Sequence, residues 1–513
     1  MKGIQKITRL LLILLALAMM LSVFAACATE DDGDVTATDG DGDGDSTKPV
    51  NDGFQQGGPW DGWELDENGY IKDRLPEDMN FEDEFVILAT SNQKSHFWAD
   101  ETDVTPVGQA IYKRNETVAD RLGIVLEWNM QPTGSSSNAE KNAFVSLAEA
   151  DIKAGNEIDC VVSYNLLPYR LAGKGLALNL NSTDNLDLEA PWWPQEFTSS
   201  MMYKDQLYAL VDNASVGTLT NLSCIFFNNE LLEAKHIQSP YELVKNNEWT
   251  VPKLKELIKD TYEDFNADGQ EDKGDIYGLC TSTAARVTCW YYGVGLRFSN
   301  INENGELILN TDVETTTAKI DALVDMFSTK DSCVTDTKQY IMFEEERVYF
   351  YLCVVSMATH MVNNNVEIDY GVAPQPKLNS EQTRYYTHVP NTHEAWYLLS
   401  GTKNPDCSSA FIECMASEAY RQVNQVFFEE TIKLRYAPGE ELSDMYDLIR
   451  ESITFDFVYL YGDVIGWDIN TGIRNCIVTP TSYQWATVWA GIKDSMNTKF
   501  QTVLDVYEQN VAG

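Results

Sequence analysis

Residues 241–280 read YELVKNNEWTVPKLKELIKDTYEDFNADGQEDKGDIYGLC, and this stretch predicts a helix, an acidic loop and a strand, in that order. Thr250 is a good N-cap, and Pro252 falls in the first turn, where its missing N–H costs little. Apolar residues then recur at helical spacing and form a face that we expect to pack inward, namely Leu254, Leu257, Ile258 and Tyr262. The closing residues 276–280, IYGLC, look like a strand.

The acidic loop within this stretch carries oxygen-bearing side chains at the spacing of a twelve-residue Ca²⁺ loop. Gly269 stands at the sixth position, where such a loop turns sharply. Position 12 is Asp275 rather than the Glu of an EF-hand, and a strand follows, so a paired EF-hand is not expected. The alternative is a solvated acidic turn that binds no ion. The expected ligands of a structural Ca²⁺ are Asp264, Asn266, Asp268, Gln270 through its backbone carbonyl, Asp272 and Asp275.

The N-terminus predicts export and lipid attachment. Residues 1–26 combine three basic residues with an apolar run of 17 residues that ends in small side chains, as in a signal peptide. The run is short for a membrane span, and no other stretch is long and apolar enough to be one. Phe24-Ala25-Ala26-Cys27 resembles a lipoprotein box, so we expect Cys27 to be lipidated. The alternative is an ordinary signal peptide cleaved nearby, with Cys27 incidental.

Length and charge limit what the rest of the chain is. A chain of 513 residues is too long for one ordinary core, so we expect two lobes. The 79 acidic and 37 basic residues leave a net charge of −42, which argues against nucleic-acid partners. We expect residues 27–75, which include the run DGDGDGD at 39–45, to be a disordered tether. Nine further cysteines show no CxxC pair, which favours buried core thiols and leaves open whether one or two bridges form.

Strand and helix patterns alternate from residue 85 onward, which predicts an α/β fold with parallel strands. The expected strands are residues 85–89, 124–128, 158–163, 206–211, 224–229 and 394–399. The expected helices besides the one after Thr250 are residues 107–122, 140–154, 315–327 and 408–417.

Three motifs carry a resemblance to a known family. Residues 241–280, LAGKGLALNL at 171–180 and YGVAPQPK at 370–377 follow one another in the order seen in extracellular solute-binding lipoproteins of ABC importers. The chain resembles the cluster that includes maltose-binding-type proteins and their Gram-positive relatives, over about residues 80 to 500. The resemblance implies a two-lobed periplasmic-binding-protein-like fold (type II) with the ligand cleft between the lobes. Lobe 1 would comprise residues 76–211 and 389–436, and lobe 2 residues 212–388 and 437–513.

The same resemblance implies a function without covalent chemistry. A monomer held outside the cell by lipid would capture a small solute by hinge closure and deliver it to an ABC permease. Common enzyme signatures such as a Walker A loop, a GxSxG elbow or an HExxH helix are absent from the sequence. A secreted carbohydrate hydrolase stays open as an alternative, because sequence alone cannot show a facing pair of carboxylates. A peptide-binding receptor is a second alternative.

Aromatic residues favour a carbohydrate ligand, because sugars present apolar ring faces and polar edges. The chain has 12 tryptophans, and His388 and His393 lie near an expected crossing between lobes. The alternative for each aromatic residue is ordinary packing. The candidate ligand contacts, chosen near expected strand ends and crossings, are Trp98, Tyr164, Asn165, Asp212, Asn213, Trp290, Tyr291, Trp396, Trp467 and Asp468.

Overall fold

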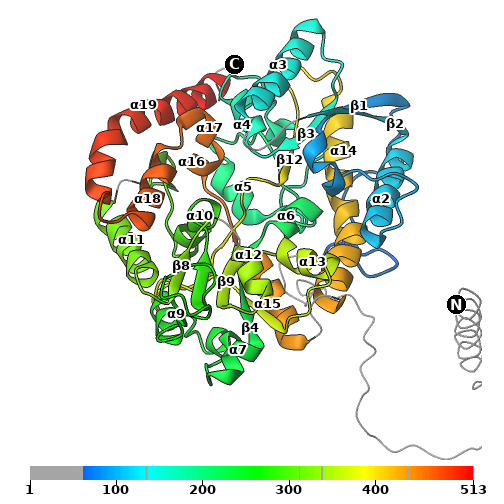
Figure 1. The fold of residues 1–513 in the computed structure, drawn as a ribbon. Coiled ribbons are helices and arrows are strands. Elements are labelled where there is room, and N and C mark those ends of the chain that lie inside the picture. Colours follow the sequence, from blue (N-terminus) through cyan, green and yellow to red (C-terminus); the bar gives the residue numbers. More distant parts are fainter. Residues whose placement is uncertain (1–61, 133–136, 311, 337–338, 436–438, 512–513) are drawn as a thin grey trace, which may run out of the picture. The chain divides into compact units, whose positions relative to one another are not determined.

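The first sheet of the computed structural model is the core of what we call lobe 1 (Figure 1). It contains β1 (Asp83–Thr90), β2 (Ile124–Gln131), β3 (Cys160–Tyr164) and β12 (Glu394–Tyr397), in the order β12-β3-β1-β2. β1 pairs in parallel with β2 and β3, whereas β12 runs antiparallel to β3. α2 (Pro106–Leu122) and α3 (Asn138–Ala154) are the crossovers between the parallel strands. The expected alternation of strands and helices in this region is confirmed.

The structure describes residues 62–511 except 133–136, 311, 337–338 and 436–438. The expected signal peptide, Cys27 and most of the expected tether lie outside the described residues.

The second sheet belongs to lobe 2 and contains the strand of the stretch at residues 241–280. Its order is β10 (Tyr370–Ala373), β4 (Ser223–Asn228), β9 (Val348–Val354), β5 (Tyr277–Thr281) and β8 (Ser332–Val334). β9, β5 and β8 are parallel, and β4 is antiparallel to both of its neighbours. α8 (Pro240–Lys245) and α9 (Val251–Leu257) precede β5, and the Thr250 side chain accepts from Lys253 N, so the N-cap is confirmed. Helix α9 ends at Leu257, earlier than the periodicity predicts.

The chain passes between the two sheets three times. It leaves lobe 1 through α6 (Val216–Thr220) into β4, and it returns through β11 (Thr387–His388) into β12. The third passage is β13 (Ile453–Thr454), which pairs in parallel with β11. The prediction of a strand at residues 206–211 is wrong, because this segment makes only isolated bridges, between Gln206 and Tyr203 and between Leu210 and Trp396.

The C-terminal helices pack on both lobes. α14 (Pro405–Glu418) covers α2 in lobe 1, and α15 (Glu440–Glu451) covers β10 in lobe 2. α17 (Gly462–Ile465) packs on α4 (Leu167–Ala172), while α18 (Asp468–Val478) and α19 (Trp485–Val511) pack on α11 (Val313–Phe327). In the described part of the chain, no helix is both long enough and apolar enough for a membrane span.

The remaining elements connect these layers. They are η1 (Ser91–His96), η2 (Leu180–Ser182), α5 (Gln195–Met201), α7 (Asn229–Ala234), α10 (Ala285–Gly293), β6 (Ser299–Ile301), β7 (Leu307–Leu309), α12 (Gln339–Glu344), α13 (Ser356–Asn363), η3 (Ala419–Val423), η4 (Gln425–Arg435) and α16 (Phe457–Leu460).

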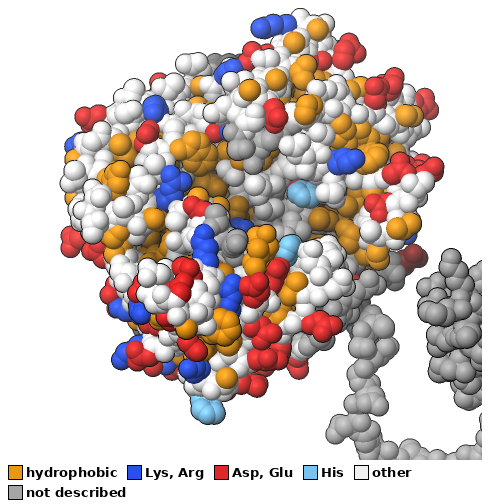
Figure 2. Space-filling view, in the orientation of Figure 1, with side chains coloured by type: hydrophobic (Ala, Val, Ile, Leu, Met, Phe, Trp, Pro, Cys, Tyr) orange, Lys and Arg blue, Asp and Glu red, His pale blue; other side chains and the backbone are white. Residues whose placement is uncertain are grey.

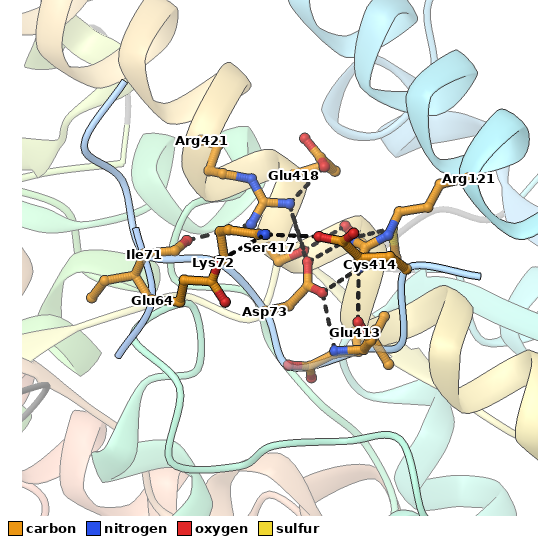
Figure 3. Close-up of polar contacts among 12 residues, drawn as sticks. Glu64, Ile71, Lys72, Asp73, Arg121, Glu413, Cys414, Ser417, Glu418 and Arg421 are labelled. Carbon is orange, nitrogen blue, oxygen red and sulfur yellow. Dashed lines mark hydrogen bonds and ion pairs between the residues drawn. The ribbon is translucent and has the colours of Figure 1, made fainter. Parts of the chain in front are cut away.

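Residues 62–82, which we call the N-terminal strap, lie against lobe 1. Asp73 of the strap is 1% exposed and accepts hydrogen bonds from Arg121 at 2.6 and 2.7 Å, from Arg421 at 3.1 Å and from Ser417 at 2.7 Å (Figure 3). The strap thereby ties α2 to α14 and η3. The tether expected to extend to residue 75 is therefore too long, because the end of that segment carries apolar and charged anchors that fold onto lobe 1.

Candidate functional site

The carboxyl ends of the two sheets meet where the chain passes between the lobes. Asn165 follows β3, and its backbone N–H donates to the carbonyl of His393 at 3.1 Å. The neighbouring Thr392 donates its hydroxyl to Asn221 Oδ1 at 2.5 Å. Asn221 lies just before β4, whose first residue pairs with the last residue of β9. Open parallel sheets bind ligands outside the carboxyl ends of their strands, so we take this region, the crossing site, as the candidate functional site.

His393 and Asn165 form a buried polar pair at the crossing site. The ring Nε2 of His393 lies 2.6 Å from Asn165 Nδ2, and its Nδ1 lies 2.8 Å from the carbonyl oxygen of Pro390. Burial lowers the pKa of His393 to about 4, so the ring is neutral at pH 7. Nδ1–H therefore donates to Pro390, and Nε2 accepts from the Asn165 amide. Asn165 Oδ1 is left buried with no protein partner.

We expect His393 to make the protein sensitive to acid. The pKa in the folded state is about 4 and the ordinary value is 6.5, so the unfolded state binds more protons between these values. Stability is then fully present above about pH 6.5 and falls as the pH decreases toward 4, by about 3 kcal/mol. Urea unfolding at pH 7 and pH 4.5 measures this loss. His393→Gln keeps an acceptor for Asn165 but does not titrate, and should lose less; an equal loss would contradict the assignment.

Glu394 and His96 form a second buried pair beside the first. Glu394 Oε2 lies 2.8 Å from His96 Nδ1, and the Glu394 side chain is 1% exposed. Burial acts to raise the pKa of Glu394, but the His96 ring and its hydrogen bond hold it below its ordinary value. A Cβ on Gly217 would lie 1.8 Å from Glu394 Oε2, so only glycine allows α6 to pass this close.

Aromatic side chains continue from the crossing site in a row. The Trp467 ring meets Tyr459 edge-on with centroids 5.5 Å apart, and Tyr459 meets His388 at 4.8 Å. His388 stacks on Tyr292 with centroids 4.5 Å apart and planes inclined by 12°. Burial lowers the pKa of His388, which is therefore neutral, and its Nε2 has no protein partner.

A cavity of about 650 Å³, the Trp467 cavity, lies at the end of this row. Helices α3 and α4 supply one wall and α17 with Trp467 the other, and Figure 1 shows these helices gathered at one end of the molecule. Lys141 of this wall has its Nζ 6.0 Å from the centre of the Tyr164 ring at the end of β3. The face drawn in Figure 2 is also hollowed near its middle, with hydrophobic and histidine side chains at the edge of the hollow.

Asp463 holds the wall of the Trp467 cavity together. Its Oδ2 accepts from Lys141 Nζ and from Arg170 Nε, each at 2.7 Å, and its Oδ1 accepts from Trp467 Nε1 at 3.0 Å. Burial acts to raise the pKa of Asp463, but hydrogen bonds from Lys141 and Trp467 hold it below its ordinary value. The carboxylate thus fixes the orientation of an indole ring that borders the cavity.

The structure gathers three of the ten expected ligand residues around this region. Tyr164 and Asn165 lie at the crossing site, and Trp467 borders the cavity. Asp212 and Asn213 lie at the first passage between lobes, where Asp212 accepts from Ala214 N at 2.6 Å. Burial raises the pKa of Asp212 to about 8.

The other five expected ligand residues lie elsewhere. Trp290 and Tyr291 are fully buried in lobe 2, and Trp396 packs between Phe97 and Phe411 in lobe 1. Trp98 borders a different cavity beside α2 and β2, and Asp468 is exposed and paired with Lys499 at 3.2 Å. Sequence reasoning named neither Lys141, Arg170 nor Asp463, because polar residues on helices give no local signal of a shared partner.

The acidic loop at residues 264–275 turns most of its oxygen atoms toward its own backbone. Asp264, for example, accepts from the N–H groups of Asp268 and Gly269 at 3.2 and 3.0 Å. Across the described residues, no three His, Cys, Asp or Glu side chains are gathered as metal ligands. Asp275 is fully buried, with Oδ2 accepting from Asp272 N at 3.1 Å and from Tyr262 OH at 2.8 Å. Its Oδ1 has no protein partner.

Comparison with solved structures defines the fold. No protein-family model matches the sequence, and no curated protein matches it. The sugar-binding protein MalE of Xanthomonas citri is similar with a TM-score of 0.53 and 12% identity, over 83% of this chain and 99% of that one. The cyclic alpha-maltosyl-1,6-maltose binding protein of Arthrobacter globiformis gives 0.51 and 12%, over 82% and 98%. The galacto-N-biose-/lacto-N-biose I-binding protein of the ABC transporter of Bifidobacterium longum gives 0.50 and 13%, over 82% and 97%.

These likenesses extend over nearly the whole of each solved structure. The chain therefore has the two-lobed α/β fold of the maltose-binding-type solute-binding proteins, and the fold expected from the sequence is confirmed.

Proposed function

We propose that this protein is the substrate-binding component of an ABC importer that captures an extracellular oligosaccharide. The observation that carries the proposal is the Trp467 cavity, which places an indole face beside amide, ammonium and guanidinium groups next to the crossing site. Sugars need this combination of an apolar surface for the ring face and hydrogen-bonding groups for the edge. The solved structures with the same fold are described as sugar-binding proteins, which supports the proposal.

Hinge closure is the mechanism that this architecture favours. The lobes are joined at α6 and at the β11 and β13 pair, which are short segments that absorb backbone rotation. A ligand that contacts both lobes binds the closed state better than the open state and shifts the population toward it. The permease then recognises the closed surface.

A thermal-shift screen of the exported chain against oligosaccharides, peptides and amino acids tests the proposal. A ligand at about 100 times its dissociation constant should add roughly 2.7 kcal/mol to stability. A shift with one class of sugar, with the sugar recovered unchanged, supports a binding protein. Consumption of the sugar would instead favour a hydrolase, and a shift only with peptides would favour a peptide receptor.

Trp467→Ala should weaken binding of the sugar found in this screen. Loss of a central aromatic contact typically costs about 2 kcal/mol, which corresponds to roughly thirtyfold in the dissociation constant. Trp98→Ala is the matched control, because Trp98 lies beside α2 and β2, away from the Trp467 cavity. Isothermal titration of both variants gives the comparison. Equal affinities for Trp467→Ala and the unmodified protein would place the ligand elsewhere.

The Phe24-Ala25-Ala26-Cys27 sequence supports attachment to the outer membrane leaflet through lipid on Cys27. A single acyl chain binds a membrane only weakly and reversibly, so stable anchoring through Cys27 needs more than one chain. Labelling of cells with a fatty-acid analogue should mark the protein, and Cys27→Ser should release it into the medium.

The acidic loop supports a structural Ca²⁺ that joins α9 to β5. One carboxylate oxygen of Asp275 is buried without a protein partner. The other accepts a hydrogen bond from Asp272 N within the loop. Carbonyl and carboxylate oxygens at this spacing are the ligands that Ca²⁺ prefers. The neighbouring carboxylates would exchange backbone hydrogen bonds for the ion.

We expect calcium at about 100 times its dissociation constant to add roughly 2.7 kcal/mol to stability. Asp268→Ala should lower thermal stability in calcium and make the protein indifferent to chelator. Differential scanning calorimetry with calcium and with chelator measures both effects. An unmodified protein that already ignores the chelator would show that the loop binds no ion.

A further inference from the structure

Two buried carboxylates, Asp73 and Asp463, each pair with two cations, but the net charge of the two clusters differs. At Asp73, the two partners are Arg121 and Arg421. Arg421 also pairs with Glu418 at 2.6 Å, and the Arg421 and Glu418 side chains are both 10% exposed. Two cations therefore meet two carboxylates, and this cluster is neutral.

The cluster at Asp463 has an excess positive charge. Lys141 and Arg170 share Asp463 as their ion-pair partner, and the three side chains are 6%, 15% and 5% exposed. The other nitrogens of Arg170 donate to the neutral amide oxygens of Asn142 at 2.7 Å and Asn138 at 3.1 Å. Two cations therefore meet one carboxylate in a part of the molecule with little access to water.

This excess charge faces the Trp467 cavity. Lys141, Arg170 and Asp463 all border the cavity. The third cation of the cavity lining, Lys174, forms an ion pair at 2.5 Å with Glu149, which does not line the cavity. Among the residues that line the cavity, Asp463 is the single carboxylate, although the whole chain carries 79 acidic residues. Buried charges are normally paired, so an excess cation on a cavity wall favours an anionic occupant.

We propose that the Trp467 cavity takes an oligosaccharide whose sugar unit carries an anionic group, a carboxylate as in a uronic acid or a phosphate. This inference rests on the proposed function. The sugar ring lies against Trp467, and its anionic group accepts hydrogen bonds from Lys141, whose ammonium has three donors of which Asp463 takes one, and from the edge of Arg170. The amides of Asn138 and Asn142 are in reach of sugar hydroxyls at the same wall.

The test is isothermal titration of the exported chain with three probes: trigalacturonate, its carboxyl-reduced neutral counterpart, and a phosphorylated disaccharide. We expect an acidic probe to bind at least tenfold more tightly than the neutral one, with a preference that weakens as salt is raised. Comparison of the trigalacturonate and phosphate arms identifies which anion the cavity takes.

Two variants test whether the preference for the acidic probe arises at the Trp467 cavity. Asn142→Asp places a second carboxylate beside Arg170 without removing a cation, and Asn142 is exposed, so the fold should tolerate it. The variant should abolish the preference for the acidic probe, measured as the ratio of the acidic to the neutral affinity. Lys403→Gln, which removes a cation from an exposed pair with Glu157, is the control and should leave this ratio unchanged.

The outcomes separate this inference from the proposed function. Equal binding of acidic and neutral probes overturns the inference and leaves the proposed function standing. A preference that Asn142→Asp does not change also overturns it, because the charge would then be recognised elsewhere. Failure to bind any oligosaccharide in the wider screen overturns the proposed function, and this inference with it.

Discussion

Replacement of Asp73 by alanine is expected to lower the free energy of unfolding by about 4 kcal/mol, the typical cost of leaving buried cations without their partner. Arg121 and Arg421 converge on this carboxylate from α2 and η3, and Ser417 of α14 adds a third donor. Alanine would leave Arg121 without an ion-pair partner and would remove the ion pairs that join the N-terminal strap to α2 and η3. Urea unfolding at pH 7 measures the difference.

The same carboxylate predicts a loss of stability in strong acid. Burial acts to raise the pKa of Asp73, but hydrogen bonds from Arg121 and Ser417 lower it from 3.8 to about 2. Because the folded pKa lies below the unfolded one, the contribution is fully present above about pH 4. It is lost as the pH falls through about 2, and amounts to about 2 kcal/mol.

Glu157→Ala is the control for Asp73→Ala. Glu157 pairs with Lys403 at 2.7 Å, but both side chains are more than half exposed, so the pair should contribute less than about 1 kcal/mol. If the two variants lowered the free energy of unfolding by similar amounts, the buried ion pairs of Asp73 would stabilise the fold no more than one exposed ion pair does.

The second large effect is expected for Asp463→Ala, at about 3 kcal/mol. The variant leaves Lys141 and Arg170 together in a nearly buried site with no carboxylate between them, and it removes the acceptor for the Trp467 indole. Asp468→Ala is the matched control, because Asp468 lies close by in the chain, at the start of α18, and its pair with Lys499 is exposed. We expect that control to lose less than about 0.5 kcal/mol.

A double variant shows whether unpaired charge causes the loss of stability in Asp463→Ala. Adding Lys141→Met to Asp463→Ala removes one of the two cations left without a partner, so part of the lost stability should return. A coupling energy of about 1 kcal/mol or more in this cycle would confirm the mechanism. Purely additive losses would mean that Asp463 acts through packing and hydrogen bonding rather than through the buried cations.

Local sequence patterns predicted much of the fold. The helix at residues 106–122 has an apolar face, an N-cap at Thr105 and a left-handed glycine after it, and each of these signals can be read over a few residues. The strand at residues 160–164 is entirely buried and reads as an apolar run interrupted by Ser163. Residues 206–211 show the limit of such patterns, because an apolar run also suits a buried segment that makes only isolated bridges, such as the one between Leu210 and Trp396.

The candidate site depends on contacts that no local pattern contains. Asn165 and His393 are 228 positions apart, and Lys141 and Asp463 are 322 positions apart, so nothing in the neighbourhood of either residue marks the other. The sequence predicts both Trp98 and Trp467 near strand ends or crossings between lobes, yet only Trp467 borders the cavity beside the crossing site.

The sequence by itself determined the α/β class, the placement of most helices and strands, the acidic loop and the resemblance to solute-binding proteins, because these depend on residue periodicity, capping and short motifs. Only the tertiary structure decided which aromatic residues border a cavity, that residues 62–75 fold onto lobe 1, and that two cations share Asp463. Burial and ion pairing are properties of neighbours in space, and the chain brings those neighbours together from distant positions only when both lobes are formed.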